Sequence, residues 1–551
     1  MKDLKNKPFG LLLVIILSVV PLLAFLHSGF PITHDGMDHV ARIANFYKGL
    51  SEGIIFPRWA ENLNWGYGHP ILMFLYPLSS YLGSLFHFMG FSYIDSLKIV
   101  FSIAYIASGI TMYLWARKQF SEYMSIACAI LYLYSPYRFI DLYVRGAVGD
   151  HVAFIFPPLV LYFILRYFEA KKQPQKVFSF AGVAISFGLI LLAHNAISLM
   201  FIPIFIAYPL FLAKKKKEIL AVYLAFFYGL LLSAFFTFPA FLEGKFTLRD
   251  IVVGNEYMYR FVTNPLTLLY GKWNYGITGQ FSVQIGIINI LGILIFPLVL
   301  FRLKKNPLEK KLLLFFFIAF LIAIFLVLPE SNFLYQIVTT LKKFQFPWRF
   351  LSVSTFALSV ITASIFLVID KKYQKICLFI FITAMLIISF PFFRAKGYFQ
   401  KPDSFFNTIY HGSTDTGESA PIWSIRFMEH EPAGHIEKIT GDVTFKEKER
   451  HSTKHSYVVV VSSDSARIQE NTLYFPGWKV NVDDVSTPIQ FQDPAHRGLL
   501  TFEVPKGEHR VDIVFGDTKL RTISNLLSVS SFLFLLLIVT VITIKSKHEK
   551  R

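Results

Sequence analysis

The sequence predicts an α-helical polytopic membrane protein with about twelve transmembrane helices and a β-sandwich-like, extracytoplasmic domain near the C-terminus. Hydrophobic residues make up 54% of the 551 residues and charged residues only 16%, whereas a water-soluble domain carries about 25% charged residues. Long apolar runs recur along the chain, and one polar stretch near the end has the alternation of strands. This composition excludes a disordered chain, a disulfide-rich scaffold and an ordinary cytosolic enzyme.

A membrane span needs about 20 mostly apolar residues. The run at 70–90 is broken by Pro70, Pro77, Gly83 and Gly90, so we expect it to lie along the membrane surface. The other twelve runs are predicted to cross. They lie near 9–26, 98–116, 122–139, 152–168, 177–193, 196–213, 219–240, 282–301, 312–328, 348–369, 376–392 and 523–544.

Basic clusters fix the predicted orientation. Cytoplasmic loops are rich in Lys and Arg, and with 70–90 outside the bilayer all seven clusters fall on one face, from Lys2, Lys5 and Lys7 to the C-terminal tail. The sequence therefore predicts a multi-pass plasma-membrane protein with both termini in the cytoplasm. These clusters and their neighbours carry the whole net charge of +18. That charge faces anionic membrane lipids, so nucleic acid is excluded as a partner.

Three regions follow from this topology. Residues 1–392 form the transmembrane domain with a first outer loop at 27–97, residues 393–522 form the β-rich outer domain, and residues 523–551 form the last helix and a basic tail. Within the outer domain, strands are predicted at 456–462, 472–475, 479–482, 499–504 and 509–515, with turns at Pro476-Gly477 and Pro505-Lys506-Gly507. We expect this domain to bind a partner, to cover the site or to be a passive module.

The first outer loop carries the strongest candidate site. Asp35, Asp38, His39 and Arg42 have the spacing of one helix face, directly after the first span. A carboxylate there can act as general base on a hydroxyl. Alternatively, Asp35, Asp38 and His39 can hold a divalent metal such as Mg²⁺ or Mn²⁺. Arg42 suits a phosphate. The same spacing also fits a plain helix start, with Asp35 as N-cap and Asp38 in the first turn.

Two further groups lie at the same outer level. Arg145 is a candidate for phosphate binding, and Asp150 and His151 are candidates for a metal or an acceptor; a loop in which Asp150 is a helix N-cap is the alternative. His194, between two spans, is either a site residue or a polar turn residue. Weaker candidates on the outer face are Glu243, Arg249, Arg260 and Arg349. Arg349 also fits an aromatic-belt anchor.

Few charged residues lie deep in any predicted span. Ion-coupled carriers place such residues near the middle of the membrane, so the pattern argues against a secondary transporter. The polar groups collect at the outer interface, where a lipid-linked substrate presents its headgroup.

Several motifs resemble one family of membrane proteins. They are the run 34–86, which begins HDGMDHVARIANFYKG, and the later YSPYRFIDLYVRGAVGDH, LLAHNAIS and YFPGWKVNVDD. The chain resembles bacterial and archaeal proteins described as related to 6-pyruvoyl-tetrahydropterin synthase, close to the YfhO-like membrane proteins. Its architecture also looks like that of GT-C glycosyltransferases, which use polyprenyl-phosphate-linked sugars. That resemblance implies an essential acid in the first outer loop, here Asp35 or Asp38.

The first functional hypothesis is therefore a membrane glycosyltransferase that moves a sugar from a polyprenyl-phosphate donor to an envelope acceptor at the outer face. Asp35 and Asp38 would be catalytic, and Arg42 and Arg145 would bind the phosphate. His39, Asp150, His151 and His194 are second-line candidates. The alternative hypothesis is a transporter, a flippase or a non-catalytic scaffold for lipid-linked envelope sugars.

Overall fold

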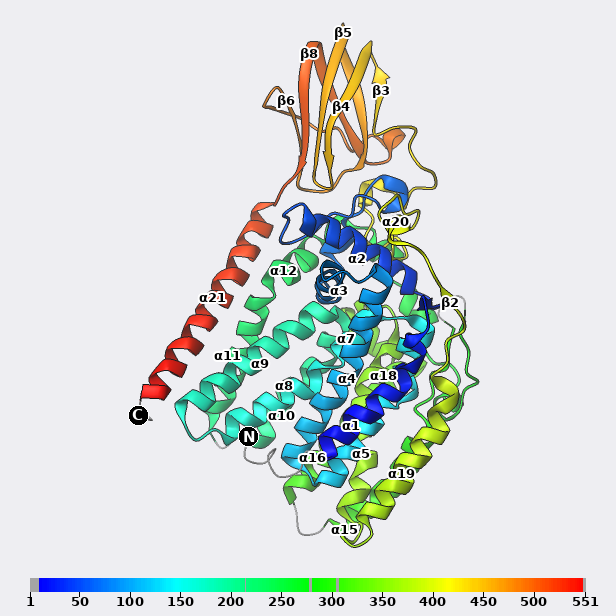
Figure 1. The fold of residues 1–551 in the computed structure, drawn as a ribbon, viewed down its shortest axis with the longest axis vertical. Coiled ribbons are helices and arrows are strands. Elements are labelled where there is room, and N and C mark those ends of the chain that lie inside the picture. Colours follow the sequence, from blue (N-terminus) through cyan, green and yellow to red (C-terminus); the bar gives the residue numbers. More distant parts are fainter. Residues whose placement is uncertain (1–8, 214, 277–279, 304–306, 549–551) are drawn as a thin grey trace.

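The computed structural model describes residues 9–213, 215–276, 280–303 and 307–548. The chain is a multi-pass helical protein with an antiparallel sheet near its C-terminus. The sheet stands at one end of the helical bundle, while helix α1 begins and helix α21 ends toward the other end (Figure 1). Several residues of the basic clusters lie outside the described residues, namely Lys2, Lys5, Lys7, Lys214, Lys304, Lys305, Lys550 and Arg551.

The described residues contain nine helices long and apolar enough to cross a membrane. A tenth candidate span is a pair of helices, α11 and α12, bent by 77°. The other two of the twelve predicted spans are shorter apolar helices of 12 and 16 residues, α5 and α15. Every predicted span thus coincides with an apolar helix, although these two are shorter than the roughly 20 residues that a perpendicular crossing needs.

The long helices follow one another with short connections. Their bounds are α1 Phe9–Val19, continued by a 3₁₀ segment to Leu26; α4 Tyr93–Gln119; α5 Glu122–Leu133; α7 Val148–Ala153 with α8 Phe156–Glu169; α9 Gln173–Ala193; α10 Asn195–Leu212; α11 Lys216–Leu232; α12 Ala234–Leu242; α15 Ile287–Arg302; α16 Pro307–Val327; α18 Leu351–Ala363; α19 Gln374–Ser389; and α21 Lys519–His548. Shorter helices include α6 Pro136–Phe139, α13 Arg249–Val252, α14 Leu266–Leu269, α17 Asn332–Ile337 and α20 Asp403–Phe406.

The first outer loop forms two helices at the end of the bundle that carries the sheet. The predicted amphipathic helix is α2, Gly36–Ser51, and its inner face buries Val40, Ile43 and Phe46. The interrupted run 70–90 forms a 3₁₀ turn and the helix α3, Leu78–Phe88. With 11 residues, α3 is about 16 Å long, too short to cross a bilayer. It lies beneath α2 (Figure 1), as the sequence predicted for a non-crossing segment.

The outer domain contains a six-stranded antiparallel sheet in the order β3-β5-β8-β6-β7, with β4 also paired to β5. The β-rich character is confirmed, but the strands join a single sheet, whereas a sandwich has two. The reason is that two long strands of 20 and 17 residues, β5 and β8, run through the whole domain. The strands are β3 Ile436–Thr440, β4 Val443–His451, β5 Lys454–Leu473, β6 Trp478–Val482, β7 Val485–Thr487 and β8 Leu499–Phe515.

One predicted turn is wrong. Pro505-Lys506-Gly507 does not separate two strands, because β8 continues through it opposite β5. The register shifts between Val461 and Ser465 of β5 at this point, so a bulge absorbs the proline and the strand bends without ending. The predicted turn at Pro476-Gly477 is confirmed, since it joins β5 to β6.

A buried network of charges attaches the sheet to the first outer loop. Arg450 of β4 donates to Glu61 (2.8 Å) and to Glu470 of β5 (3.0 Å), and Lys48 of α2 donates to the other oxygen of Glu61 (2.5 Å). His455 lies 2.9 Å from Glu470. Burial favours the neutral acid, but His455 and Arg450 hold the pKa of Glu470 down at about 2. The network therefore stays charged at neutral pH and fixes the sheet to α2.

We expect Glu470→Gln to destabilise the protein by about 3 kcal/mol, because it leaves the buried Arg450 guanidinium with one carboxylate fewer. Thermal unfolding in detergent, together with proteolysis of the sheet domain, measures this loss. Glu508→Gln, at an exposed position of β8, is the matched control and should change neither. Equal stability of the two variants would contradict a role for the network in docking.

Candidate functional site

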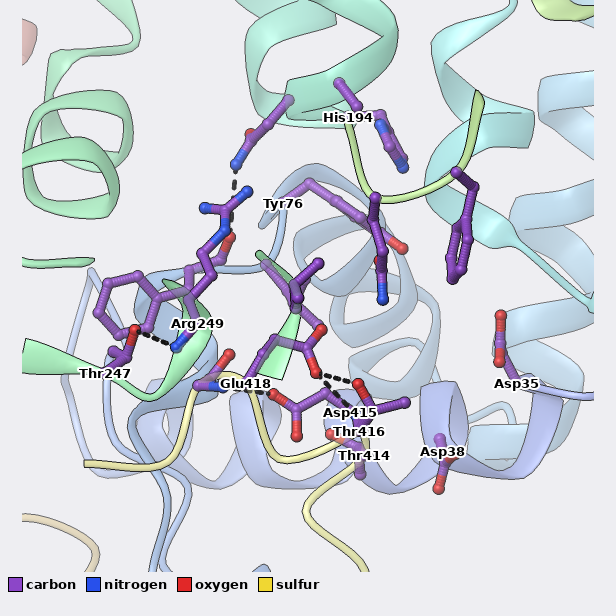
Figure 2. A pocket seen from close by; sticks show the side chains of 18 of the residues that line it. Asp35, Asp38, Tyr76, His194, Thr247, Arg249, Thr414, Asp415, Thr416 and Glu418 are labelled. Carbon is purple, nitrogen blue, oxygen red and sulfur yellow. Dashed lines mark hydrogen bonds between the residues drawn. The ribbon is translucent and has the colours of Figure 1, made fainter. Parts of the chain in front are cut away.

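A polar cavity of about 290 Å³ lies between the first outer loop and the segment that leads to the sheet. Six parts of the chain line it, and five of them are residues 35–42, 74–76, 194–196, 247–253 and 343–349. The sixth is 414–419, from the outer domain (Figure 2). Among the predicted site residues, Asp35, Asp38, His39, Arg42 and His194 line this cavity.

The backbone places Asp35 at the rim of the transmembrane bundle. Its N–H donates to the carbonyl of Arg145 (2.8 Å), and the N–H of His34 donates to the carbonyl of Val144 (3.0 Å). Gly146 permits this close contact, because it has φ +67° and a Cβ there would lie 2.2 Å from the Thr33 hydroxyl. Asp35 is thus held against the short segment that follows the π-helical turn Ile140–Arg145.

The Asp35 carboxylate has no partner in the described part of the chain. Asp35 occupies the N-cap position of α2 but makes no capping hydrogen bond; the Thr33 hydroxyl accepts from Gly36 N–H instead (3.1 Å). The plain helix-start interpretation therefore does not explain this side chain. Burial raises the pKa of Asp35, and the nearby Arg145, His34 and Arg42 oppose that rise. A carboxylate of raised pKa is a stronger base.

Asp38 and Arg42 hold the outer segment in place. The Tyr410 hydroxyl donates to Asp38 (2.7 Å), and the Arg42 guanidinium donates to the carbonyl of Thr414 (2.6 Å) and to His39 Nδ1 (2.9 Å). His39 therefore accepts at Nδ1, and burial holds its pKa well below the ordinary value. Tyr410 occupies one oxygen of Asp38, whereas the Asp35 carboxylate accepts no hydrogen bond from the described residues, so Asp35 is the more open acid of the two.

Arg145 and Asp150 lie behind the cavity wall. Arg145 donates to Asp141 (2.6 Å) and to Asp150, and its guanidinium stacks 4.6 Å over the Trp348 ring. Neither Arg145 nor Asp150 lines the cavity. The structure thus places the predicted phosphate ligand Arg145 in a buried ion-pair network. Asp150 lies inside α7 and is not its N-cap, which is Ala147.

His194 lines the cavity with both ring nitrogens engaged. Nδ1 accepts from the Ile197 N–H (3.2 Å), and Nε2 lies 2.6 Å from Asp150. This geometry is that of a helix cap, which agrees with the alternative that His194 is a polar turn residue. Its ring also stacks on Tyr76 at 4.9 Å.

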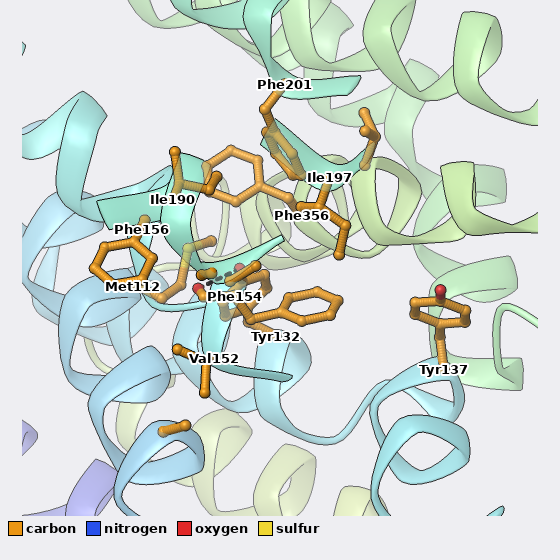
Figure 3. Packing of buried hydrophobic residues seen from close by; sticks show 14 of the residues in the cluster. Met112, Tyr132, Tyr137, Val152, Phe154, Phe156, Ile190, Ile197, Phe201 and Phe356 are labelled. Atoms are coloured by element: carbon orange, nitrogen blue, oxygen red, sulfur yellow. Dashed lines mark hydrogen bonds between the residues drawn. The ribbon is translucent and has the colours of Figure 1, made fainter. Parts of the chain in front are cut away.

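His151 belongs to the hydrophobic core and not to the cavity. Its ring packs against Phe101 (5.1 Å) and Tyr105 (5.6 Å) and is fully buried. Next to it, the Tyr132 hydroxyl donates to the Phe154 carbonyl (2.8 Å) within the aromatic cluster shown in Figure 3.

Three further basic residues line the cavity: Arg249, Lys343 and Arg349. Arg249 and Arg349 were weaker candidates from the sequence, and Lys343 was not predicted. Within the described residues, none of them forms an ion pair with a carboxylate. The Arg349 guanidinium donates to the Phe344 carbonyl (3.0 Å) and stacks on Phe346 (4.7 Å), and its Nε is buried without a partner. Burial lowers the pKa of Arg249. The signal available in the sequence was their position in outer segments, away from the cytoplasmic clusters.

The described residues contain no group of three His, Cys, Asp or Glu side chains arranged to hold a metal ion. Asp38 is bonded to Tyr410 and His39 to Arg42, so Asp35, Asp38 and His39 do not converge. These residues therefore do not fit the predicted Mg²⁺ or Mn²⁺ site.

The segment 413–419 also escaped sequence reasoning, which found no catalytic motif in the outer domain. It reads Ser-Thr-Asp-Thr-Gly-Glu-Ser and contributes Thr414, Asp415, Thr416, Glu418 and Ser419 to the cavity. Its signal was a run of small polar residues with two acids, just before the first strand.

Comparison with known proteins gives limited matches. No family model matches the chain, so the resemblance to YfhO-like proteins stays a prediction. An uncharacterized protein of Lactococcus lactis subsp. cremoris (strain MG1363) is 24% identical over 315 residues, which are 54% of this chain and 50% of that protein. The chain thus spans about half the length of the curated relative that it matches.

Three solved structures are similar to the chain at low sequence identity. The chain is 14% identical to the arabinofuranosyltransferase AftD from Mycobacteria, with a TM-score of 0.41 over 69% of this chain and 26% of that one. It is 14% identical to the Archaeoglobus fulgidus oligosaccharyltransferase, with a TM-score of 0.39 over 76% of this chain and 54% of that one. It is 12% identical to ArnT from Cupriavidus metallidurans, with a TM-score of 0.28 over 64% of this chain and 77% of that one. TM-scores in this range do not establish a common fold.

The raised pKa of Asp35 predicts a trade-off between function and stability. Burial favours the neutral form of Asp35 in the folded chain. The contribution of this side chain to stability is therefore fully present below the ordinary carboxyl pKa, and it is lost as the pH rises through the raised pKa. We therefore expect Asp35→Asn to raise the unfolding temperature by a few degrees at pH 8 and less at pH 5. The exposed Asp250 supplies the control, Asp250→Asn. A lower unfolding temperature of Asp35→Asn at pH 8 would show that the ionised carboxylate is stabilising instead.

Proposed function

We propose that this chain is a membrane glycosyltransferase of the GT-C kind, which moves a sugar from a polyprenyl-phosphate-linked donor to an envelope acceptor. One observation supports this most: the unpartnered carboxylate of Asp35 lines a cavity that also holds the unpaired cations Arg249, Lys343 and Arg349. A free base beside a cationic pocket is the combination that transfer from a sugar phosphate requires.

In this mechanism Asp35 accepts the proton of an acceptor hydroxyl. The acceptor oxygen then bonds to the anomeric carbon of the sugar while the bond from that carbon to the phosphate oxygen breaks. The polyprenyl phosphate leaves with the electron pair of that bond. Arg249, Lys343 and Arg349 neutralise the charge that grows on the phosphate, and guanidinium groups do so with two parallel hydrogen bonds.

Arg42 and Arg145 take supporting roles in this proposal. Arg42 keeps one buried nitrogen, Nε, without a partner, so it can donate a further hydrogen bond to the substrate. Arg145 acts through the backbone, since its carbonyl accepts from the N–H of Asp35. Both arginines also lie close enough to lower the pKa that burial raises at Asp35.

The proposed reaction takes place at the outer leaflet of the plasma membrane. The positive-inside rule puts the basic clusters and both termini in the cytoplasm. Helix α2, which contributes Asp38, His39 and Arg42 to the cavity lining, lies toward the opposite end, near the sheet (Figure 1). The lipid donor then reaches the cavity from the membrane, and the β-rich domain faces the envelope.

Asp35→Asn is expected to lower transfer at least 100-fold, because it removes the general base while keeping the shape of the side chain. The assay is transfer from polyprenyl-phosphate sugars by purified protein, with mass spectrometry of envelope glycans from cells that carry each variant. Asp95→Asn, at a half-exposed acid that pairs with Lys98, is the control and should be fully active. Full activity of Asp35→Asn would contradict the proposal. Movement of lipid-linked sugar across the membrane without transfer to an acceptor would favour a transporter.

Arg249→Gln should weaken binding of polyprenyl phosphate about tenfold or more, since it removes a charged hydrogen-bond donor from the cavity. Binding to the purified protein in lipid nanodiscs measures this change. Lys245→Gln removes an exposed charge of the same loop that does not line the cavity, and it should bind normally. If both variants bind like the wild type, the phosphate lies elsewhere.

A further inference from the structure

The segment 413–419 has a rigid, self-bonded shape. One oxygen of Asp415 accepts from the Ser413 hydroxyl (2.8 Å) and from the Gly417 N–H (2.9 Å), and the other accepts from the Ser419 N–H (3.0 Å). Both oxygens of Asp415 are therefore engaged by its own turn. Its role is to shape the segment, and it leaves Glu418 as the acid of this segment with free capacity.

Glu418 offers an open acceptor to the cavity. Its Oε2 accepts from the hydroxyl (2.6 Å) and the N–H (2.8 Å) of Thr416, while its Oε1 has no hydrogen-bond partner within the described residues. Burial, followed by the neighbouring Asp415, raises the pKa of Glu418. In Figure 2, Glu418 groups with Thr414, Asp415 and Thr416, with Arg249 on one side and Asp35 on the other.

Two buried polar groups of the same cavity lack partners. The Thr414 hydroxyl and His39 Nε2 make no hydrogen bond to the described residues, although these residues are only 6% and 4% exposed. Buried polar atoms are nearly always hydrogen-bonded, so an unpaired donor or acceptor in a cavity indicates a group that a ligand would satisfy. Thr414 itself is held by its carbonyl, which accepts from Arg42.

The chemistry of this wall differs from that of the cationic wall. Hydroxyls, a carboxyl group and an imidazole that donates at Nε2 can each exchange hydrogen bonds with alcohols. Asp415 and Glu418 repel anions, so a phosphate is favoured beside Arg249, Lys343 and Arg349. A neutral, polyhydroxylated ring matches the remaining part of the cavity.

We propose that the segment 413–419 binds the hydroxyl groups of the donor's sugar ring, with Glu418 Oε1 and the Thr414 hydroxyl as the contacts that distinguish one sugar from another. This inference rests on the proposed function for the identity of the donor. It gives the segment that precedes the sheet a part in specificity.

Binding experiments on the full chain in nanodiscs test this inference. The probes are a polyprenyl phosphate without sugar and the same lipid carrying one of a panel of hexoses and pentoses. The wild type should bind at least one glycosylated lipid more tightly than the bare phosphate. Glu418→Ala should lower that affinity about tenfold and Thr414→Val about fivefold, the usual loss for hydrogen bonds to charged and neutral groups. Thr414→Val should bind the bare phosphate within about twofold of the wild type. Glu418→Ala removes a charge that repels anions, so it should bind the bare phosphate at least as tightly as the wild type.

Glu431→Ala, at an exposed acid that lies outside the cavity, is the matched control and should bind every probe normally. The inference is overturned if the wild type has no preference for any glycosylated lipid, or if Glu418→Ala and Thr414→Val weaken both kinds of probe equally. Failure of the proposed function looks different: the variants would still lose the sugar preference, while the wild type transfers no sugar to any acceptor.

Discussion

The candidate site depends on two hydrogen bonds between helix α2 and the segment before the sheet: Tyr410 to Asp38, and Arg42 to the Thr414 carbonyl. Each bond includes an ionisable group in a largely buried setting, where such bonds are strong because little water competes. Together they set residues 413–419 against the cavity. Backbone hydrogen bonds on either side, from Asn64 N–H to the Gly412 carbonyl (2.9 Å) and from Leu248 N–H to the Ala420 carbonyl (2.9 Å), support the same wall.

The charges around the cavity divide into two sets with different tasks. Arg145, Asp141, Asp150 and His194 satisfy one another, and they fix the backbone that presents Asp35. Asp35, Arg249, Lys343 and Arg349 form no direct ion pair with another described residue, although Glu418 and Asp250 act on Arg249 at longer range. Unpaired charges in a partly buried site cost stability, and proteins retain such groups mostly where function needs them.

The outer domain is attached to the same helix that carries Asp35. The Lys48–Glu61–Arg450–Glu470 network ties the sheet to α2, and Tyr410 and Thr414 tie the preceding segment to it. At the far side, Arg521 at the start of α21 pairs with Glu243 at the end of α12 (2.8 Å). The domain is thus fixed at several points and supplies cavity residues. The interpretation as a passive module does not account for that contribution.

The sequence by itself determined the spans, the non-crossing segment 70–90 and the candidacy of Asp35. A span across a bilayer needs an apolar run of a certain length, and Lys and Arg are enriched in the loops of one face. Both features depend on residues that are close together in the sequence. Helical periodicity likewise predicted that 35–42 shares one face. Tertiary structure alone decided which ionisable groups are paired. Asp38 and Arg42 each form a hydrogen bond with a residue 372 positions away along the chain. Arg145 forms ion pairs with two buried carboxylates. Glu418 lines the cavity, although it belongs to the outer domain. Local patterns carry no information on such distant contacts, because the packing of whole elements sets them.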